Sequence, residues 1–102
     1  MKVNILKVAQ SEFLDAKEYY EIERSGLGKI FEKEIRQGIE KIKKFPEAWS
    51  VERPEIRRFI LHKFPYKILY SIQKDEILIL AFAHSHRKPD YWDERVKQLS
   101  KK

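Results

Sequence analysis

Residues 57–92 read RRFILHKFPYKILYSIQKDEILILAFAHSHRKPDYW, and most of this stretch has the pattern of β-strands. Apolar and polar residues alternate from Glu55 to His62 and again from Tyr66 to Ile72, with Pro65 between the two runs. A period of two places successive side chains on opposite faces of a sheet. Residues 77–83, ILILAFA, are apolar throughout, which is typical of a central strand that is covered on both faces. The sequence therefore predicts three consecutive strands, and we expect them to pair antiparallel.

The first half of the chain predicts a strand followed by two helices. Residues 3–9 are rich in valine and isoleucine and predict a strand. Ser11 then stands where an N-cap would, and the first helix is expected to run to about Arg24. Residues 25–28, SGLG, break this helix, because glycine readily adopts the backbone conformations that end helices. Apolar residues at spacings of three and four predict a second helix over residues 27–44, so the pair forms a helical hairpin.

The remaining segments complete the predicted topology. A loop is expected between Pro46 and Pro54, and a final short helix over residues 91–99 with Asp90 as its cap. The predicted order is β-α-α-β-β-β-α. This is an α+β fold in which an N-terminal helical hairpin covers one face of an antiparallel sheet of about four strands. A length of 102 residues fits a single domain, spanning residues 1–102.

The composition limits the classes of function. The chain has 22 basic and 16 acidic side chains and a formal charge of +6, which favours a polyanion or an acidic protein as partner. The alternative is a lysine-rich surface that is simply well solvated. There is no cysteine, so disulfides and thiolate metal sites are excluded and a reducing compartment is favoured. Residues 1–8 are interrupted by Lys7 and predict neither a signal peptide nor a membrane span, so we expect a cytoplasmic protein without membrane contact.

Cations gather on or beside the predicted strands, where alternate residues share a face and can converge. They are Arg57, Arg58, Lys63, Lys67, Arg87 and Lys88. The alternative is an exposed edge strand that the cations guard against aggregation. Arg87 suits a phosphate, because its guanidinium is planar and always charged. Periodicity leaves open which faces the neighbouring strands share, because it does not determine their register.

Two histidines, His84 and His86, follow the last predicted strand in an H-x-H pattern. On an extended segment both would point the same way, as metal ligands can, but a catalytic zinc usually takes three protein ligands and His62 is the one further histidine. Proton transfer is the better use of an imidazole, which titrates near neutrality. The alternative for His84 is a strand-end side chain that hydrogen-bonds the backbone. Tyr91 could stack on a base or exchange a proton, whereas Trp92 is expected to anchor the last helix in the core.

Three segments together resemble the RelE/ParE superfamily of toxins. They are RRFILHKFPYKILY at residues 57–70, ILILAFAH at residues 77–84, and the R-x-P-x-Y-W pattern of residues 87–92. These toxins are the toxic halves of type II toxin–antitoxin modules and are also called plasmid stabilisation proteins. The resemblance implies the α+β fold described above and a cognate antitoxin protein as partner. RelE-like members cleave messenger RNA in the ribosomal A site, whereas ParE-like members poison DNA gyrase and lack the nuclease residues.

The resemblance also implies roles for particular residues. Cleavage of RNA needs a base for the 2′-hydroxyl, a cation for the crowded phosphate and an acid for the leaving oxygen. Carried over by position, the catalytic candidates are Lys67, His84, His86, Arg87 and Tyr91. The RNA-binding candidates are Arg57, Arg58, His62, Lys63 and Lys88. Neither a metal nor another cofactor is implied.

Two departures from the nuclease pattern stand out. The loop ahead of the strand expected from Glu55 to His62 reads Glu52-Arg53-Pro54-Glu55, where the best-known nucleases are rich in lysine. The arginine usual after the tyrosine of the next strand is Lys67, which cannot form a bidentate fork. The resemblance nevertheless favours a RelE-like, ribosome-dependent mRNA endoribonuclease that inhibits translation. The alternatives are a ParE-like gyrase inhibitor without catalytic activity and an inactive homologue that only binds an antitoxin. We expect Lys67 and residues 84–91 to meet on the sheet surface that the helices leave uncovered.

Overall fold

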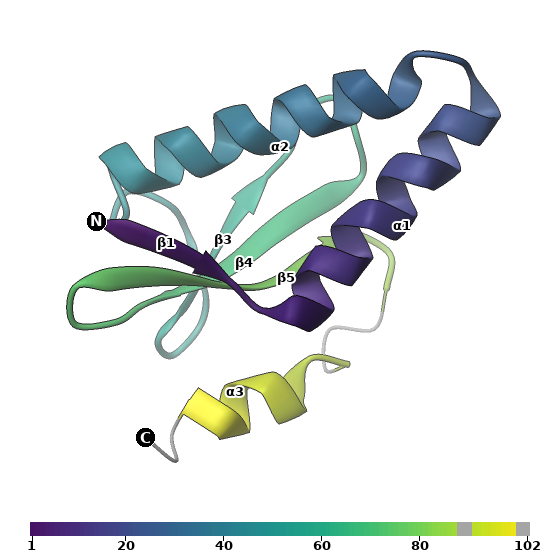
Figure 1. Cartoon of the computed structure of the whole chain (residues 1–102). Helices are drawn as coiled ribbons and strands as arrows, with labels where there is room; N and C mark the ends of the chain where they lie inside the picture. Colours follow the sequence, from purple (N-terminus) through teal and green to yellow (C-terminus); the bar gives the residue numbers. More distant parts are fainter. Residues whose placement is uncertain (88–90, 100–102) are drawn as a thin grey trace.

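A computed structural model describes residues 1–87 and 91–99, in which helices and strands form three layers (Figure 1). The elements in chain order are β1 (Lys2–Ile5), α1 (Lys7–Glu23), α2 (Leu27–Lys44), β2 (Val51–Arg53), β3 (Ile56–Ile60), β4 (Tyr66–Ile72), β5 (Glu76–His84) and α3 (Asp93–Leu99). The predicted α+β class is confirmed, and so are the helical hairpin and the three consecutive strands. The predictions of Lys88 as an RNA contact and of Asp90 as a helix cap lie outside the described residues.

The sheet has five strands in the order β1-β5-β4-β3-β2. Strands β2 to β5 pair antiparallel with their chain neighbours, but β1 lies parallel to β5, with Lys2 opposite Glu76 and Ile5 opposite Ile79. The sheet is therefore mostly antiparallel, and it has one strand more than the approximate number that we expected. The additional strand, β2, has only three residues and lies between two prolines, so its sequence carries too short an alternation to indicate a strand.

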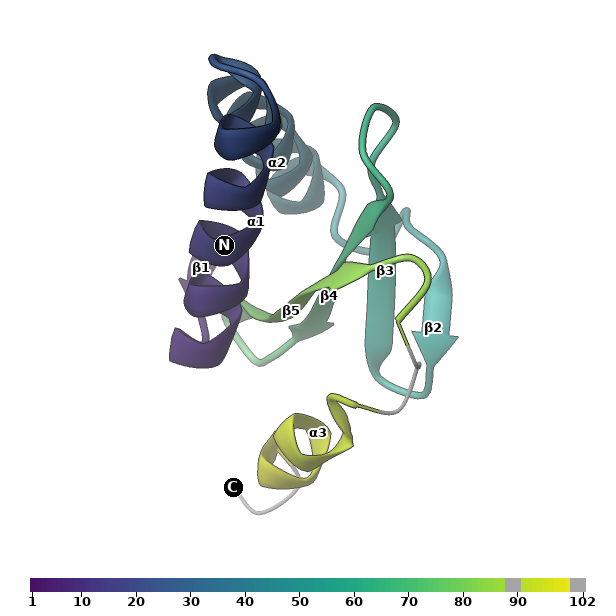
Figure 2. The same ribbon diagram turned by 90° about the vertical axis from the view of Figure 1, so that its right-hand side faces the viewer.

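The two faces of the sheet are covered differently, as Figure 2 shows. The helical hairpin packs on one face, here called the hairpin face, where Phe31 of α2 is fully buried against a core that includes Ile68 and Tyr70 of β4. The much shorter α3 covers the opposite face, here called the α3 face, where Trp92, directly before α3, belongs to a core that includes Leu69 of β4. Trp92 is 1% exposed, so the expectation that it anchors the last helix is confirmed.

β5 is apolar throughout because both of its faces are buried, and a β-bulge interrupts its alternation. Leu69 of β4 pairs with Ala81, but the next residue, Tyr70, pairs with Ile79, so β5 carries one extra residue at Leu80. Side chains before and after the bulge are distributed to both faces. Ile77, Ile79 and Phe82 join the core under the hairpin, and Leu78, Leu80, Ala81 and Ala83 join the core under α3.

The start of α1 differs from the prediction. The strand expected over residues 3–9 ends at Ile5, and α1 begins at Lys7 with Leu6 as its N-cap and no side-chain cap. Ser11 therefore lies inside the helix, and the prediction that it caps the helix is wrong. The physical reason is that the two kinds of backbone bonding meet at Leu6: its N–H makes the last bond to β5, with the Ile79 carbonyl oxygen at 3.1 Å, and its carbonyl oxygen accepts the first helical bond, from the Gln10 N–H at 2.9 Å.

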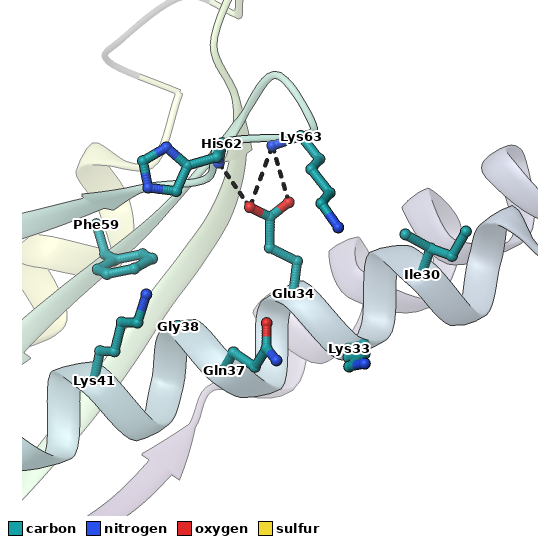
Figure 3. A pocket seen from close by; sticks show the side chains of 9 residues that line it. All are labelled: Ile30, Lys33, Glu34, Gln37, Gly38, Lys41, Phe59, His62 and Lys63. Atoms are coloured by element: carbon teal, nitrogen blue, oxygen red, sulfur yellow. Dashed lines mark hydrogen bonds between the residues drawn. The ribbon is translucent and has the colours of Figure 1, made fainter.

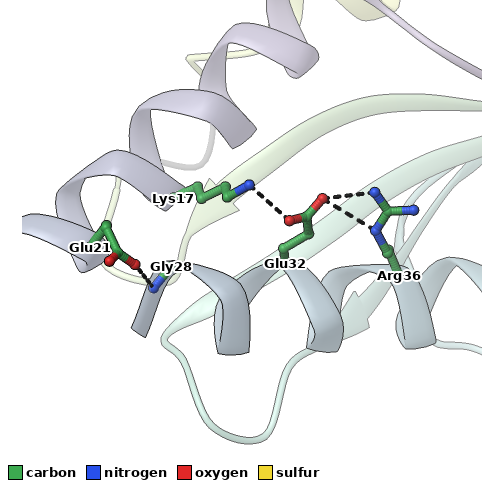
Figure 4. Close-up of polar contacts among 5 residues, drawn as sticks. All are labelled: Lys17, Glu21, Gly28, Glu32 and Arg36. Carbon is green, nitrogen blue, oxygen red and sulfur yellow. Dashed lines mark hydrogen bonds and ion pairs between the residues drawn. The ribbon is translucent and has the colours of Figure 1, made fainter. Parts of the chain in front are cut away.

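Carboxylates of the hairpin fasten its two helices to each other (Figure 4). Glu21 of α1 accepts a hydrogen bond from the Gly28 N–H at 3.0 Å, and a side chain at position 28 would bring Cβ within 2.8 Å of the Lys17 carbonyl oxygen. Glu32 of α2 accepts from Lys17 at 2.8 Å and from Arg36 at 2.7 Å. The hydrogen bonds from Lys17 and then Arg36 lower the pKa of Glu32 to about 2.

This low pKa predicts how acid should affect the fold. Because the pKa of Glu32 is lower than its ordinary value of 4.5, its ion pairs stabilise the folded chain above that pH, and the stabilisation is lost as the pH falls towards about 2. We expect Glu32→Gln to be less stable than the wild type near neutrality and to lose less stability over this acid range. Urea unfolding at a series of pH values measures both. Glu40→Gln is the control, because Glu40 is exposed and lies 3.8 Å from its lysine partner. Parallel acid profiles for wild type and Glu32→Gln would contradict the expectation.

Candidate functional site

Lys67 of β4 lies on the α3 face of the sheet. It pairs with Ala83 of β5, whose side chain belongs to the core under α3. Its Nζ atom is 2.9 Å from Oε2 of Glu52, and Nη1 of Arg58 is 3.3 Å from Oε1 of the same carboxylate. One acidic side chain of β2 therefore engages two of the cations that the sequence suggested for RNA.

The Glu52 carboxylate is ionised in this arrangement. Its side chain is 12% exposed, and burial alone would raise its pKa. The hydrogen bond and charge of Lys67, followed by those of Arg58, outweigh the effect of burial, so the pKa of Glu52 is lowered. The three side chains consequently form a charged cluster at neutral pH, with the carboxylate between the cations.

His84 lies on the opposite, hairpin face. It pairs with Tyr66, and the two rings meet edge-on with centroids 5.1 Å apart. The backbone N–H of His86 donates to Nδ1 of His84 at 3.1 Å, so this ring nitrogen already serves as an acceptor within the chain. His84 and Arg87 border a hollow of about 270 Å³ against α1, together with Glu12, Asp15, Ala16, Tyr19, Tyr66 and Phe82.

The expectation that Lys67 and His84 meet on one surface is therefore wrong. Tyr66 and Lys67 are successive residues of β4, so their side chains point to opposite faces, and His84 is the partner of Tyr66. The hollow beside His84 also lies against α1, so the helices do not leave that surface uncovered.

Arg87 and Tyr91 do come together. The guanidinium carbon of Arg87 is 3.9 Å from the centre of the Tyr91 ring, which is a cation–π contact. The Tyr91 hydroxyl is buried and makes no hydrogen bond of ordinary geometry within the described residues. Burial, followed by the charge of the Glu12 carboxylate, raises the pKa of Tyr91 to about 12. A phenol with so high a pKa holds its proton at neutral pH and is poorly matched to acid–base exchange there.

The other RNA-binding candidates have contacts within the chain. Arg57 donates from Nη1 to the Trp49 carbonyl oxygen at 2.6 Å. The backbone N–H groups of His62 and Lys63 both donate to the Glu34 carboxylate of α2, as Figure 3 shows. His62 and Lys63 border a different hollow, of about 240 Å³, between α2 and β3.

Sequence reasoning missed the side chains that hold α3 to the sheet. β1 ends at Ile5, so β5 has backbone groups without a strand partner on that side beyond Ile79. Glu12 of α1 accepts from the Phe82 N–H at 3.2 Å, and Arg95 of α3 donates to the Leu80 carbonyl oxygen at 3.0 Å.

Glu12 and Arg95 also bond each other through two nitrogens of the guanidinium, at 3.0 and 2.9 Å. The two residues are 83 positions apart, and nothing in the sequence pattern signals that they meet. No group of three or more histidine, cysteine, aspartate or glutamate side chains within residues 1–87 and 91–99 could hold a metal ion.

The family model described as "ParE toxin of type II toxin-antitoxin system, parDE" matches residues 3–89. The chain belongs to this family of ParE toxins. The predicted membership of the RelE/ParE superfamily is thereby confirmed, and a ParE-family toxin has a cognate antitoxin as its partner. No curated protein is similar enough to match.

Solved structures agree with this assignment at the level of the fold. The toxin chain is similar to a chain of the chromosomal ParDE toxin–antitoxin system from P. aeruginosa, with 17% identity, a TM-score of 0.62, and coverage of 82% of this chain and 95% of that one. It is similar to the isolated E. coli RelE toxin, with 16% identity, a TM-score of 0.63, and coverage of 96% and 97%. No helix in the described part of this ParE-family chain is long and apolar enough to cross a membrane.

Proposed function

We propose that this toxin acts as a ParE-like inhibitor of DNA gyrase, by binding rather than by cleaving RNA. The observation that carries the proposal is the separation of the nuclease candidates. Lys67 is ion-paired to Glu52 at 2.9 Å on the α3 face, while His84 lies on the hairpin face with Tyr66. Catalysis by a group of side chains needs them around one reacting phosphate, because proximity and orientation supply much of the rate.

The state of the remaining candidates supports the same function. Arg57, Arg58 and Lys67 already have partners within the chain, and the Tyr91 phenol is buried with a raised pKa. A match to the ParE family also favours the ParE-like activity, which the superfamily resemblance associates with gyrase and with no chemistry of the toxin's own.

An exposed apolar surface on α1 is consistent with a protein target. Leu14, Tyr19 and Ile22 are 60%, 57% and 77% exposed, although each is a large apolar side chain. Large apolar side chains that stay exposed on a small domain are candidate contacts for another protein. The same surface could meet either the target or the antitoxin.

A ribosome-dependent mRNA endoribonuclease is the second candidate. The observation in its favour is that His84, Arg87 and the carboxylates of Glu12 and Asp15 border one hollow, so ionisable groups do converge there. An imidazole, a guanidinium and a carboxylate are groups that can transfer protons and stabilise a phosphate.

A supercoiling assay separates the two functions. We expect purified toxin to reduce the conversion of relaxed plasmid to supercoiled plasmid by gyrase, and prior addition of the antitoxin to restore the activity. Messenger RNA ends mapped after induction in cells should match those of uninduced controls. Unaffected supercoiling together with new mRNA ends would establish the nuclease instead, and a toxin that leaves both gyrase and mRNA unchanged would be inactive.

A further inference from the structure

We infer that Glu52 is a specificity-determining residue whose carboxylate fills an anion site between Lys67 and Arg58 and so excludes RNA phosphates from the α3 face. The inference rests on the proposed function, because it explains how a fold with these cations can bind a protein without binding RNA. It assigns the ligand that the site would otherwise take, which is a phosphate of a single-stranded polynucleotide.

The geometry of the three side chains is that of an occupied anion site. Arg58 pairs with Leu69, and Lys67 pairs with Ile60, so the two cations are diagonal neighbours on one face of the β3–β4 ladder. Each cation contacts a different oxygen of the Glu52 carboxylate, at 2.9 Å for Lys67 and 3.3 Å for Arg58. Two cations on two oxygens of one anion is also how a lysine and an arginine hold a phosphate.

The backbone of β2 directs Glu52 to this position. Val51 pairs with Arg57 and Arg53 pairs with Ile56, so the register shifts at Glu52 and leaves this residue without an opposite partner on β3. Irregularities of this kind commonly re-aim a side chain. The neighbouring Arg53 adds no free charge, because it is 2.6 Å from Asp93 and lies over the Trp92 ring.

Loss of the carboxylate charge should make the face attractive to RNA. The cluster of two cations and one anion would become a cluster of two cations alone. The logarithm of affinity for single strands changes with the logarithm of salt by about −0.7 for each phosphate neutralised, so two released cations should steepen the slope by about 1.4. We expect Glu52→Gln to bind a single-stranded oligoribonucleotide roughly tenfold more tightly than wild type in low salt.

Fluorescence anisotropy with a labelled oligoribonucleotide tests the inference, over a series of salt concentrations. Glu47→Gln is the matched control, because it makes the same change of charge at an exposed residue that has no ion pair or side-chain hydrogen bond within the described chain. We expect Glu47→Gln to shift affinity only slightly, and the double variant Glu52→Gln/Lys67→Met to return most of the way to wild type. Circular dichroism verifies that each variant is folded, and Glu52→Ser provides a second variant that removes the same charge.

Equal affinities and equal salt slopes for Glu52→Gln, Glu52→Ser and Glu47→Gln would overturn the inference. The outcome is separate from that of the supercoiling assay, which uses the wild-type toxin. A gain of RNA binding in Glu52→Gln with no effect of the wild type on gyrase would sink the proposed function and leave the role of Glu52 standing. Inhibition of gyrase by the wild type, with no gain of RNA binding in Glu52→Gln, would support the proposed function and overturn the role of Glu52.

Discussion

Phe31→Ala should lower the free energy of unfolding by about 3–5 kcal/mol, the usual range for removing a buried phenylalanine ring. The Phe31 side chain is 0% exposed, and its ring lies 5.1 Å from that of Phe64, 5.2 Å from that of Tyr20 and 5.3 Å from that of Tyr66. These rings come from α1, α2, β4 and the loop before β4, so the cavity would open where the hairpin meets the sheet.

Urea unfolding followed by tryptophan fluorescence and circular dichroism measures this loss. Small domains are stable by only about 5–15 kcal/mol, so the change should shift the midpoint strongly. Ile30→Ala is the matched control on the preceding residue of α2, where the side chain is 40% exposed, and it should cost less than about 1 kcal/mol. Equal losses for the two variants would show that the aromatic cluster is not the centre of the core.

Glu12→Gln should weaken the attachment of α3 and lower the free energy of unfolding by about 2–3 kcal/mol. Removing one partner of a buried ion pair costs about 3–5 kcal/mol, and this pair is 14% and 15% exposed, which reduces the effect. The substitution removes the negative charge opposite the Arg95 guanidinium and one of its two carboxylate acceptors, and it weakens the acceptor for the Phe82 N–H.

Hydrogen exchange of the α3 amides measures this effect directly. We expect the α3 amides to exchange faster in the variant than in the wild type. The α2 amides should change less, because the hairpin core does not depend on Arg95. Glu94→Gln removes a carboxylate from α3 itself, but Glu94 is 82% exposed and its ion pair with Lys97 lies on the surface, so protection should change little. Unchanged α3 protection in Glu12→Gln would mean that the other contacts, such as Trp92 and the Arg53–Asp93 ion pair, are enough to hold the helix.

Local patterns predicted the elements whose ends are marked in the sequence. The second helix was expected over residues 27–44 and the strand over Tyr66 to Ile72, and both agree with the structure. The second helix starts after a glycine-containing break and ends before a proline, and the strand follows a proline. Residues of these types mark the ends of helices and strands in the sequence itself. β1 and the start of α1 lack such limits, because the change from strand to helix at Leu6 is made by backbone hydrogen bonds to Ile79 and from Gln10 and not by a glycine, proline or capping residue.

The site was less predictable because it depends on contacts between distant residues. The alternation correctly placed Lys67 on the same face as Leu69. Alternation could not show that His84 pairs with Tyr66 and so faces away from Lys67, because the register of β4 and β5 is a property of the sheet. The departures at Glu52 and Lys67 were visible in the sequence, but their direct ion pair was not.

The pairing of β1 with β5 has a consequence for the synthesis of the toxin. β1 and both helices of the hairpin leave the ribosome first, yet the partner of β1 begins only at Glu76. Long-range pairings of this kind form late, because the whole intervening chain must be present before they can close. A nascent chain that stops before Ile77 lacks β5, the strand that pairs with both β1 and β4 and supplies residues to both hydrophobic cores, so translation interrupted there would release no folded toxin.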